Sequence, residues 1–367
     1  MPRLPIALVF AGVVLALFPS TTSAVPATDP RPARVPPAPP AAQGSVVVAA
    51  TNLYEGAVLP APRDLADESD IRRFARRFAE LNVAAPDVVA LQEVRGSLPA
   101  VVRRLNRAMV GRATYAAVTR PGLTRDRGAC AGARGRFTVV RDGALVINTA
   151  TTEVLDRGVI RTWGRWLPGM RGVLRRPNAA GCAEHPWARV RVTREGATRD
   201  AVVVGTHVGP RGHYLKTLAM RLLGDRAREL AGPAGLSVVA GDFNLPWCRG
   251  GAGAVESPSC PVADGHRELA DRGFGDALRA AGVSFGTRGR VDFIHTTGQA
   301  AAAGWDRCYR PRIAAGCSRR DSAFASEQAF GACQRRAIDY GSSGGACRRR
   351  AYARYYSDHP IVRATIQ

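Results

Sequence analysis

Six short apolar runs, each bordered by chemically active side chains, constrain the fold of this chain more than any other feature. Each run is five or six residues long and rich in small or β-branched residues, which is typical of buried strands. The runs occupy residues 45–50, 87–91, 201–205, 236–240, 291–295 and 361–366. Residues 71–81, 214–230 and 266–281 predict helices. In the first of these, Ile71, Phe74 and Phe78 share one face, with arginines between them. Strands interspersed with helices predict an α/β fold.

Polar side chains that can bind a metal or move a proton border or lie within these runs. They are Asn52, Gln92, Glu93, Thr206, His207, Asp242, Asn244, Asp292, Ser357, Asp358 and His359. Strand ends that meet at one edge of a scaffold are a common place for a binding site. An Asp or Asn after a strand is otherwise often a turn former or a helix cap, which is our interpretation of Asp276. We expect the other four histidines to be structural or on the surface; they are His185, His213, His266 and His295.

The order of these clusters is itself informative. The motifs are Thr51-Asn52-Leu53, Leu91-Gln92-Glu93-Val94, Gly205-Thr206-His207, Gly241-Asp242-Phe243-Asn244, Val291-Asp292-Phe293-Ile294 and Ser357-Asp358-His359-Pro360. In this order the series resembles the endonuclease/exonuclease/phosphatase superfamily of metal-dependent phosphodiesterases, which includes pancreatic-type deoxyribonucleases and neutral sphingomyelinases. The resemblance implies a four-layer α/β sandwich with two mainly antiparallel sheets packed between helices. It covers residues 44–367, with insertions expected near 120–199 and 299–356.

The same resemblance implies roles for the residues that match. Asn52, Glu93 and Asp358 would bind the metal, which we expect to be Mg²⁺, with Mn²⁺ or Ca²⁺ as alternatives. His359 would be the general base, oriented by Asp292. Asp242 and Asn244 would position water and the phosphate, and His207 would hold the phosphate as charge builds up. Tyr54 stands where many nucleases of the family carry an Asp, which puts a second metal ligand at the first strand in doubt.

Net charge points to the kind of substrate. The chain has a formal net charge of +22, and a protein this basic is expected to meet a polyanion. Segment 299–356 has eleven arginines against four acidic residues, and segment 120–199 has sixteen against six. Arginines mixed with aromatic residues suit a nucleic-acid backbone and its bases. We therefore expect Arg348, Arg349 and Arg350 to contact substrate, although a solvated arginine surface is the alternative.

The N-terminus predicts export. Residues 6–18 are apolar, but as a helix they would be only about 20 Å long, too short for a bilayer core of about 30 Å. With Arg3 before them and Thr22, Ser23 and Ala24 after them, residues 1–24 are typical of a signal peptide. A proline-rich linker follows at 25–43. Eight cysteines without a CxxC motif suit disulfides in a secreted protein, with their pairing open.

The sequence thus favours a secreted, metal-dependent phosphodiesterase, most simply an extracellular nuclease. The first alternative is a lipid phosphodiesterase of sphingomyelinase type, or a phosphatase on the same fold. The lipid enzyme is considered because Arg161–Met170 could lie in a membrane interface. A non-catalytic binder of polyanions is the second. No transmembrane segment and no stable protein partner are implied, while peripheral membrane contact stays open. DNA against RNA, and endo against exo cleavage, also stay open.

Overall fold

The computed structural model describes the chain in a series of ranges. They are residues 44–53, 68–94, 98–119, 122–125, 138–141, 143–162, 183–208, 213–233, 235–245, 263–283, 292–306 and 359–367. Several predicted features lie outside these ranges and therefore stay predictions from the sequence. These are the signal peptide, the linker, all eight cysteines, Tyr54, Asp358, most of Arg161–Met170 and the Arg348–Arg350 triplet.

Two six-stranded sheets form the centre of the molecule. The first has the order β13 (Ala300–Trp305), β14 (Val362–Ile366), β1 (Val46–Asn52), β2 (Val88–Gln92), β6 (Ala144–Asn148) and β3 (Tyr115–Ala117). The second has the order β11 (Gly275–Asp276), β12 (Asp292–Thr296), β10 (Leu236–Asp242), β9 (Ala197–His207), β8 (Glu184–Arg194) and β7 (Thr152–Arg161). A separate ribbon pairs β4 (Gly122–Arg125) with β5 (Thr138–Arg141).

Each six-stranded sheet has one parallel pair at its centre among the described strands. In the first sheet β1 and β2 run parallel, and in the second β9 and β10 do; the remaining neighbours are antiparallel. A helix connects the two strands of each parallel pair, as a parallel connection requires. The prediction of two mainly antiparallel sheets is therefore confirmed.

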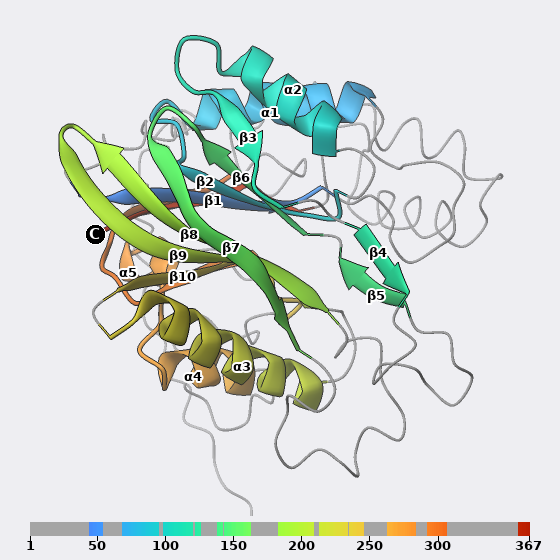
Figure 1. Ribbon diagram of the computed structural model, residues 1–367, viewed down its shortest axis with the longest axis vertical. Helices are drawn as coiled ribbons and strands as arrows, with labels where there is room; N and C mark the ends of the chain where they lie inside the picture. The colour runs from blue at the N-terminus through green and yellow to red at the C-terminus, as the bar shows by residue number, and fades with distance from the viewer. Residues whose placement is uncertain are drawn as a thin grey trace, which may run out of the picture.

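Helices cover the outer face of each sheet, which gives four layers (Figure 1). α1 (Glu68–Leu81) and α2 (Leu98–Ala108) pack on the first sheet, and α3 (His213–Ala231) and α4 (Ala263–Ala270) pack on the second. A third apolar core fills the space between the sheets. The four-layer α/β sandwich is confirmed. None of the described helices is long and apolar enough to cross a membrane.

The packing of α1 follows from its sequence. Phe74 and Phe78 are fully buried, and their rings lie 5.6 Å apart between the helix and the first sheet. Fully burying such a side chain contributes about 1.5–3 kcal/mol. The intervening Arg72 and Arg76 are exposed, so the apolar spacing alone predicts which face is buried.

One predicted helix is wrong. Residues 266–281 do not form a single helix, because α4 ends at Ala270 and the chain then forms β11 and the short α5 (Ala277–Ala280). Gly273 lies at φ +80, a conformation that favours glycine and ends the helix. The carboxylate of Asp276 accepts a hydrogen bond from the Leu278 backbone N–H at 3.1 Å. The interpretation of Asp276 as a local cap is therefore confirmed.

Candidate active site

Strand register brings the polar clusters to one edge of both sheets. Asn52 and Gln92 lie opposite each other at the ends of the parallel pair β1 and β2. In the second sheet Asp242 lies opposite His207 on one side and Asp292 on the other. Because β12 and β14 run antiparallel to their neighbours β10 and β1, their beginnings meet the ends of those strands. Two sheets therefore contribute to one site.

Asn52 joins the two sheets at the centre of this site. Its side-chain Nδ2 donates to Glu93 Oε1 at 3.0 Å and to Asp242 Oδ2 at 3.1 Å. Glu93 follows β2 with φ 55, a left-handed conformation that is uncommon outside glycine. Such backbone costs about 1–3 kcal/mol and tends to occur at functional sites. The chain thus holds Glu93 in a strained turn against a fully buried amide.

Asp242 and Asn244 form a tight turn after β10. Asn244 has φ 47, and its backbone N–H donates to Asp242 Oδ1 at 2.8 Å. The Asn244 Nδ2 donates to the Val208 carbonyl at 2.7 Å, next to His207. Gly241 has φ +141, and a Cβ there would fall 2.1 Å from the Thr206 carbonyl oxygen. Only glycine lets β9 and β10 approach this closely. The glycine of the Gly-Asp-Phe-Asn motif is therefore required by the backbone, whereas the Asp and Asn supply the polar groups.

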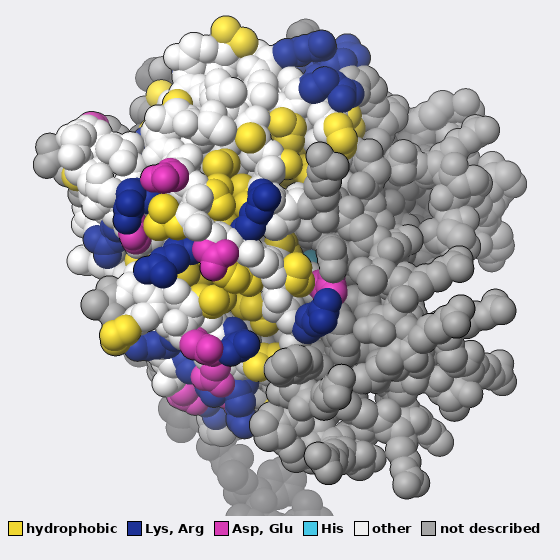
Figure 2. All heavy atoms as spheres, viewed as in Figure 1, with side chains coloured by type: hydrophobic (Ala, Val, Ile, Leu, Met, Phe, Trp, Pro, Cys, Tyr) yellow, Lys and Arg dark blue, Asp and Glu magenta, His cyan; other side chains and the backbone are white. Residues whose placement is uncertain are grey.

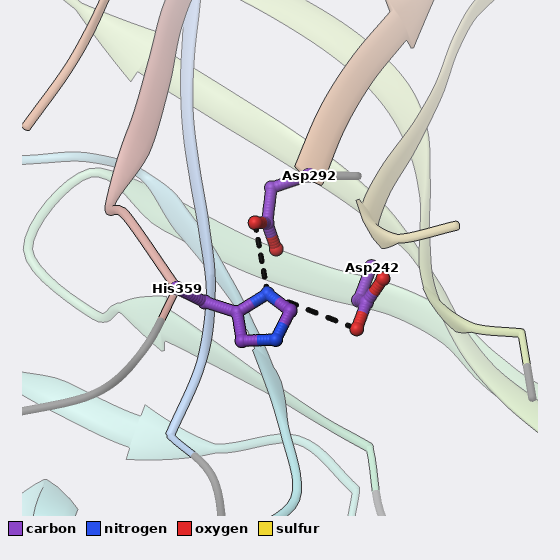
Figure 3. A group of neighbouring side chains, drawn as sticks. All are labelled: Asp242, Asp292 and His359. Atoms are coloured by element: carbon purple, nitrogen blue, oxygen red, sulfur yellow. Dashed lines mark hydrogen bonds and ion pairs between the residues drawn. The ribbon is translucent and has the colours of Figure 1, made fainter. Parts of the chain in front are cut away.

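His359 and Asp292 form a hydrogen-bonded pair (Figure 3). His359 Nδ1 lies 2.9 Å from Asp292 Oδ2 and 3.8 Å from Asp242 Oδ2. Asp292 is 1% exposed, so its carboxylate is shielded from water on most sides. A buried carboxylate that accepts from Nδ1–H orients the ring, and the lone pair of the neutral imidazole is then on Nε2.

His207 also lies close to Asp242, and to Glu93. Its Nε2 is 3.7 Å from Glu93 Oε1 and 3.7 Å from Asp242 Oδ2. The structure therefore brings together seven of the eight predicted catalytic and metal-binding residues. They are Asn52, Glu93, His207, Asp242, Asn244, Asp292 and His359.

The charge of this group suits a divalent cation. Three carboxylates, on Glu93, Asp242 and Asp292, lie close together in a largely buried place, and such a concentration of negative charge is unfavourable without a cation. Oxygen donors are the ligands of hard cations. Ligand atoms of Asp242, Asp292 and His359 also lie within 4.8 Å of one another. Glu93 is the most accessible of the three carboxylates, with its side chain 13% exposed against 2% for Asp242 and 1% for Asp292, so Glu93 with the amide oxygen of Asn52 is the better fit to a metal.

Three histidines outside the motifs have structural surroundings. His185 is buried, with its ring nitrogens 3.1 Å from the hydroxyls of Thr162 and Thr206. His266 and His295 lie against each other with a nitrogen–nitrogen distance of 3.1 Å. The side chain of His213 lies outside the described part of the structure.

One polar residue beside the site was not predicted from the sequence. Lys216 of α3 is 2% exposed, and its Nζ donates to the Asn244 carbonyl at 2.6 Å. The signal that could have identified it is its rarity, because it is the single lysine of the chain.

Comparison with known proteins places these features in context. A model of the Endonuclease/Exonuclease/phosphatase family matches residues 49–359. No curated protein matches the chain. A solved endonuclease/exonuclease/phosphatase from Bacteroides vulgatus is similar over 88% of this chain and 98% of its own, with 15% identity and a TM-score of 0.51.

Two further solved structures cover similar shares of the chain. A mannosyl-6-phosphatase from Bacteroides thetaiotaomicron covers 88% of this chain and 100% of its own, at 12% identity and a TM-score of 0.47. D. rerio TDP2 complexed with a single-strand DNA product covers 88% and 99%, at 15% identity and a TM-score of 0.42.

Proposed function

The chain belongs to the Endonuclease/Exonuclease/phosphatase family, and we propose that it is a secreted, metal-dependent phosphodiesterase that cleaves nucleic acid. Members of this family are phosphoric ester hydrolases. The observation that carries the proposal is the convergence of Glu93, His207, Asp242 and the Asp292–His359 pair at one edge of two sheets.

The Asp292–His359 pair supplies the base. With Nδ1–H donated to the buried carboxylate, Nε2 of His359 takes a proton from the attacking water. Asp292 stabilises the imidazolium that forms, because its negative charge is 2.9 Å from Nδ1. General-base catalysis of this kind contributes about 10²- to 10⁴-fold in rate.

Glu93 and Asn52 would hold a divalent ion, of which Mg²⁺ is the expected one, and Asp358 joins them on the evidence of its sequence motif alone. Enzymes of the family generally use a divalent metal. When bound, the ion neutralises phosphate charge and stabilises the leaving oxygen. The Asn52 amide, donating to both Glu93 and Asp242, keeps the two carboxylates at a fixed separation.

His207 would face the phosphate, since an imidazole N–H aimed at the phosphate oxygens stabilises the charge that builds up in the transition state. The Asn244 amide N–H₂ already donates to the Val208 carbonyl and to Asp242, so its Oδ1 is the atom left to position water. Asp242 orients both, since its Oδ2 lies 3.7 Å from His207 Nε2 and 3.3 Å from Asn244 Nδ2. The turn held by Gly241 keeps these groups in place before substrate arrives.

The charge of the outer helices α1 and α2 favours a polyanionic substrate. α1 and α2 together carry seven arginines and three acidic residues, whereas α3 and α4 carry five basic and four acidic residues. Arg72, Arg76, Arg103 and Arg107 are exposed, and no ion pair within the described residues involves them. By contrast, Arg221 and Arg272 on the opposite side bind Glu268.

Figure 2 shows the same contrast. Dark blue side chains gather at one end of the upper helical layer, where α1 and α2 lie in Figure 1. Blue and magenta side chains alternate lower down, over α3 and α4. Exposed arginines bind phosphates with release of counterions, which favours a nucleic acid over a small phosphate ester.

Secretion rests on the sequence. The short apolar segment at 6–18, the small residues at 22–24 and the even number of cysteines all favour an exported protein. Sequencing the N-terminus of the protein recovered from culture medium tests this part: mature protein should begin close to Val25.

The main experiment compares three substrates. Wild-type protein is incubated with plasmid DNA, RNA and sphingomyelin vesicles, with Mg²⁺ and with EDTA, beside a His359→Ala variant. We expect cleavage of nucleic acid that is lost with EDTA and in the variant. Turnover of sphingomyelin alone would support the lipid alternative. Nucleic-acid binding without cleavage of any substrate would support the non-catalytic alternative.

A further inference from the structure

Lys216 is an exception in this protein. It is the single lysine beside 51 arginines. It is also buried, at 2% exposed, where a cation needs a specific partner. Its Nζ donates to the Asn244 carbonyl at 2.6 Å. Burial lowers the pKa of the ammonium group, and the nearby Asp242 carboxylate opposes that shift.

The next carbonyl of the same turn is held from a second helix. His266 of α4 has Nε2 3.1 Å from the Leu245 carbonyl. A carbonyl can only accept, so Nε2 of His266 carries the proton. The Nδ1 of the neutral ring then accepts from His295 Nε2, at 3.1 Å. The outer helices α3 and α4 therefore hold two successive carbonyls of the turn that follows Asp242.

This turn depends on local hydrogen bonds. Asn244 has φ 47, a left-handed conformation that asparagine adopts more readily than other non-glycine residues because its polar groups bond locally. If the turn relaxed, the bond from the Asn244 N–H to Asp242 Oδ1 would be lost. Lysine fits this role better than arginine, because its ammonium is compact whereas a guanidinium is a planar fork.

We propose that Lys216 is a positioning residue: by holding the Asn244 carbonyl, it fixes the turn that places Asp242 and Asn244 in the active site. The role rests on the proposed phosphodiesterase activity. Lys216 itself acts through Asn244 and not on the reacting atoms.

The first test separates positioning from stability. Lys216→Met removes the ammonium but keeps the length of the side chain. On a small chromogenic phosphodiester we expect kcat to fall about 10- to 150-fold, the range for a lost hydrogen bond to a charged group, with KM changed by less than about threefold. Lys216→Arg keeps the charge and should restore part of kcat. Arg228→Met is the matched control, because Arg228 also lies on α3 and donates to a backbone carbonyl, that of Arg272.

The second test asks whether Lys216 acts through Asn244. If it does, Lys216→Met should cost less kcat in the Asn244→Ala background than in the wild type, because one of the two side chains that the turn places is already gone, while the backbone carbonyl of residue 244 and Asp242 remain. Losses that multiply would overturn the proposal, as would a Lys216→Met variant with wild-type kcat.

A third measurement is independent of activity. Amide hydrogen exchange of the 242–245 turn should be faster in Lys216→Met than in the wild type and unchanged in Arg228→Met. Equal exchange in all three proteins would overturn the proposal. If the wild type cleaves no phosphodiester, the proposed function fails, while the exchange comparison still reports on the turn.

Discussion

Replacing Asp292 by Asn tests whether the Asp292–His359 pair supplies the base. The side chain keeps its shape but loses the charge that lies 2.9 Å from His359 Nδ1. A hydrogen bond to a charged group contributes about 1.5–3 kcal/mol, which corresponds to about 10- to 150-fold in rate. Because Asp292 is 1% exposed, water cannot replace the lost charge, and we expect the upper part of this range.

The amide of the Asp292→Asn variant adds a second effect in the same direction. If its N–H₂ group faces the ring, Nδ1 must accept, and the ring proton moves to Nε2. His359 then has no lone pair on the nitrogen that faces the attacking water. The assay is kcat on a small chromogenic phosphodiester, with the melting temperature measured in parallel to confirm that the variant is folded.

Asp87→Asn is the burial-matched control. Asp87 is fully buried at the opposite edge of the first sheet, where it accepts from the Val47 backbone N–H at 2.8 Å and pairs with Arg194. Breaking a buried ion pair costs about 3–5 kcal/mol, so this variant should melt at a lower temperature while its folded fraction keeps kcat. A folded Asp292→Asn enzyme within about threefold of wild-type kcat would refute the assignment of the pair.

Three further outcomes follow from the site and the sequence. Glu93→Gln should lose most turnover with an unchanged melting temperature, and wild-type rates in excess Mg²⁺ would exclude Glu93 as a ligand. Replacing the four exposed arginines of α1 and α2 by Ala should flatten the dependence of DNA binding on log salt by about 0.9 per lost phosphate contact; an equal loss on a small diester would instead indicate damage to the site. Thiol titration of the denatured, unreduced protein should find no free cysteine, and several free thiols would contradict the disulfide prediction.

The sequence predicted correctly those helices and strands whose formation depends on the spacing of their own apolar residues. The face of α1 follows from the spacing of Ile71, Phe74 and Phe78, and the buried strands β1, β2 and β10 follow from their apolar runs. The ends of these strands carry Asn52, Glu93 and Asp242, so their meeting at one edge could be expected once an α/β fold was assumed.

Elements that depend on distant partners could not be predicted in this way. β13 has the sequence Ala-Ala-Ala-Ala-Gly-Trp, with no strand signal of its own, and forms because it pairs with β14. The helix predicted at 266–281 failed because Gly273 breaks it, a residue that a helical pattern tolerates in principle. Lys216 was missed because its importance comes from the Asn244 carbonyl, which lies 28 residues away in the sequence.

β8 shows a signal that composition obscured. Ala188, Val190 and Val192 are buried, while the alternating Arg189 and Arg191 are exposed, which is the period of a half-buried strand. In so arginine-rich a chain, the alternation is easily taken for a generally basic segment. The hairpin of β7 and β8 was therefore visible in the sequence but not predicted.

The position of β14 has a consequence for how the protein folds. β14 lies between β13 and β1, and its register pairs Ile366 with Val46, near the other end of the described chain. Contacts between residues so far apart in the sequence have a high entropic cost of loop closure, and they therefore form late and slowly. His359 lies three residues before this strand, so its ring cannot pair with Asp292 until the first sheet has closed. Recovery of catalysis during refolding should therefore coincide with protection of the β14 amides, and no intermediate that lacks this strand should cleave substrate.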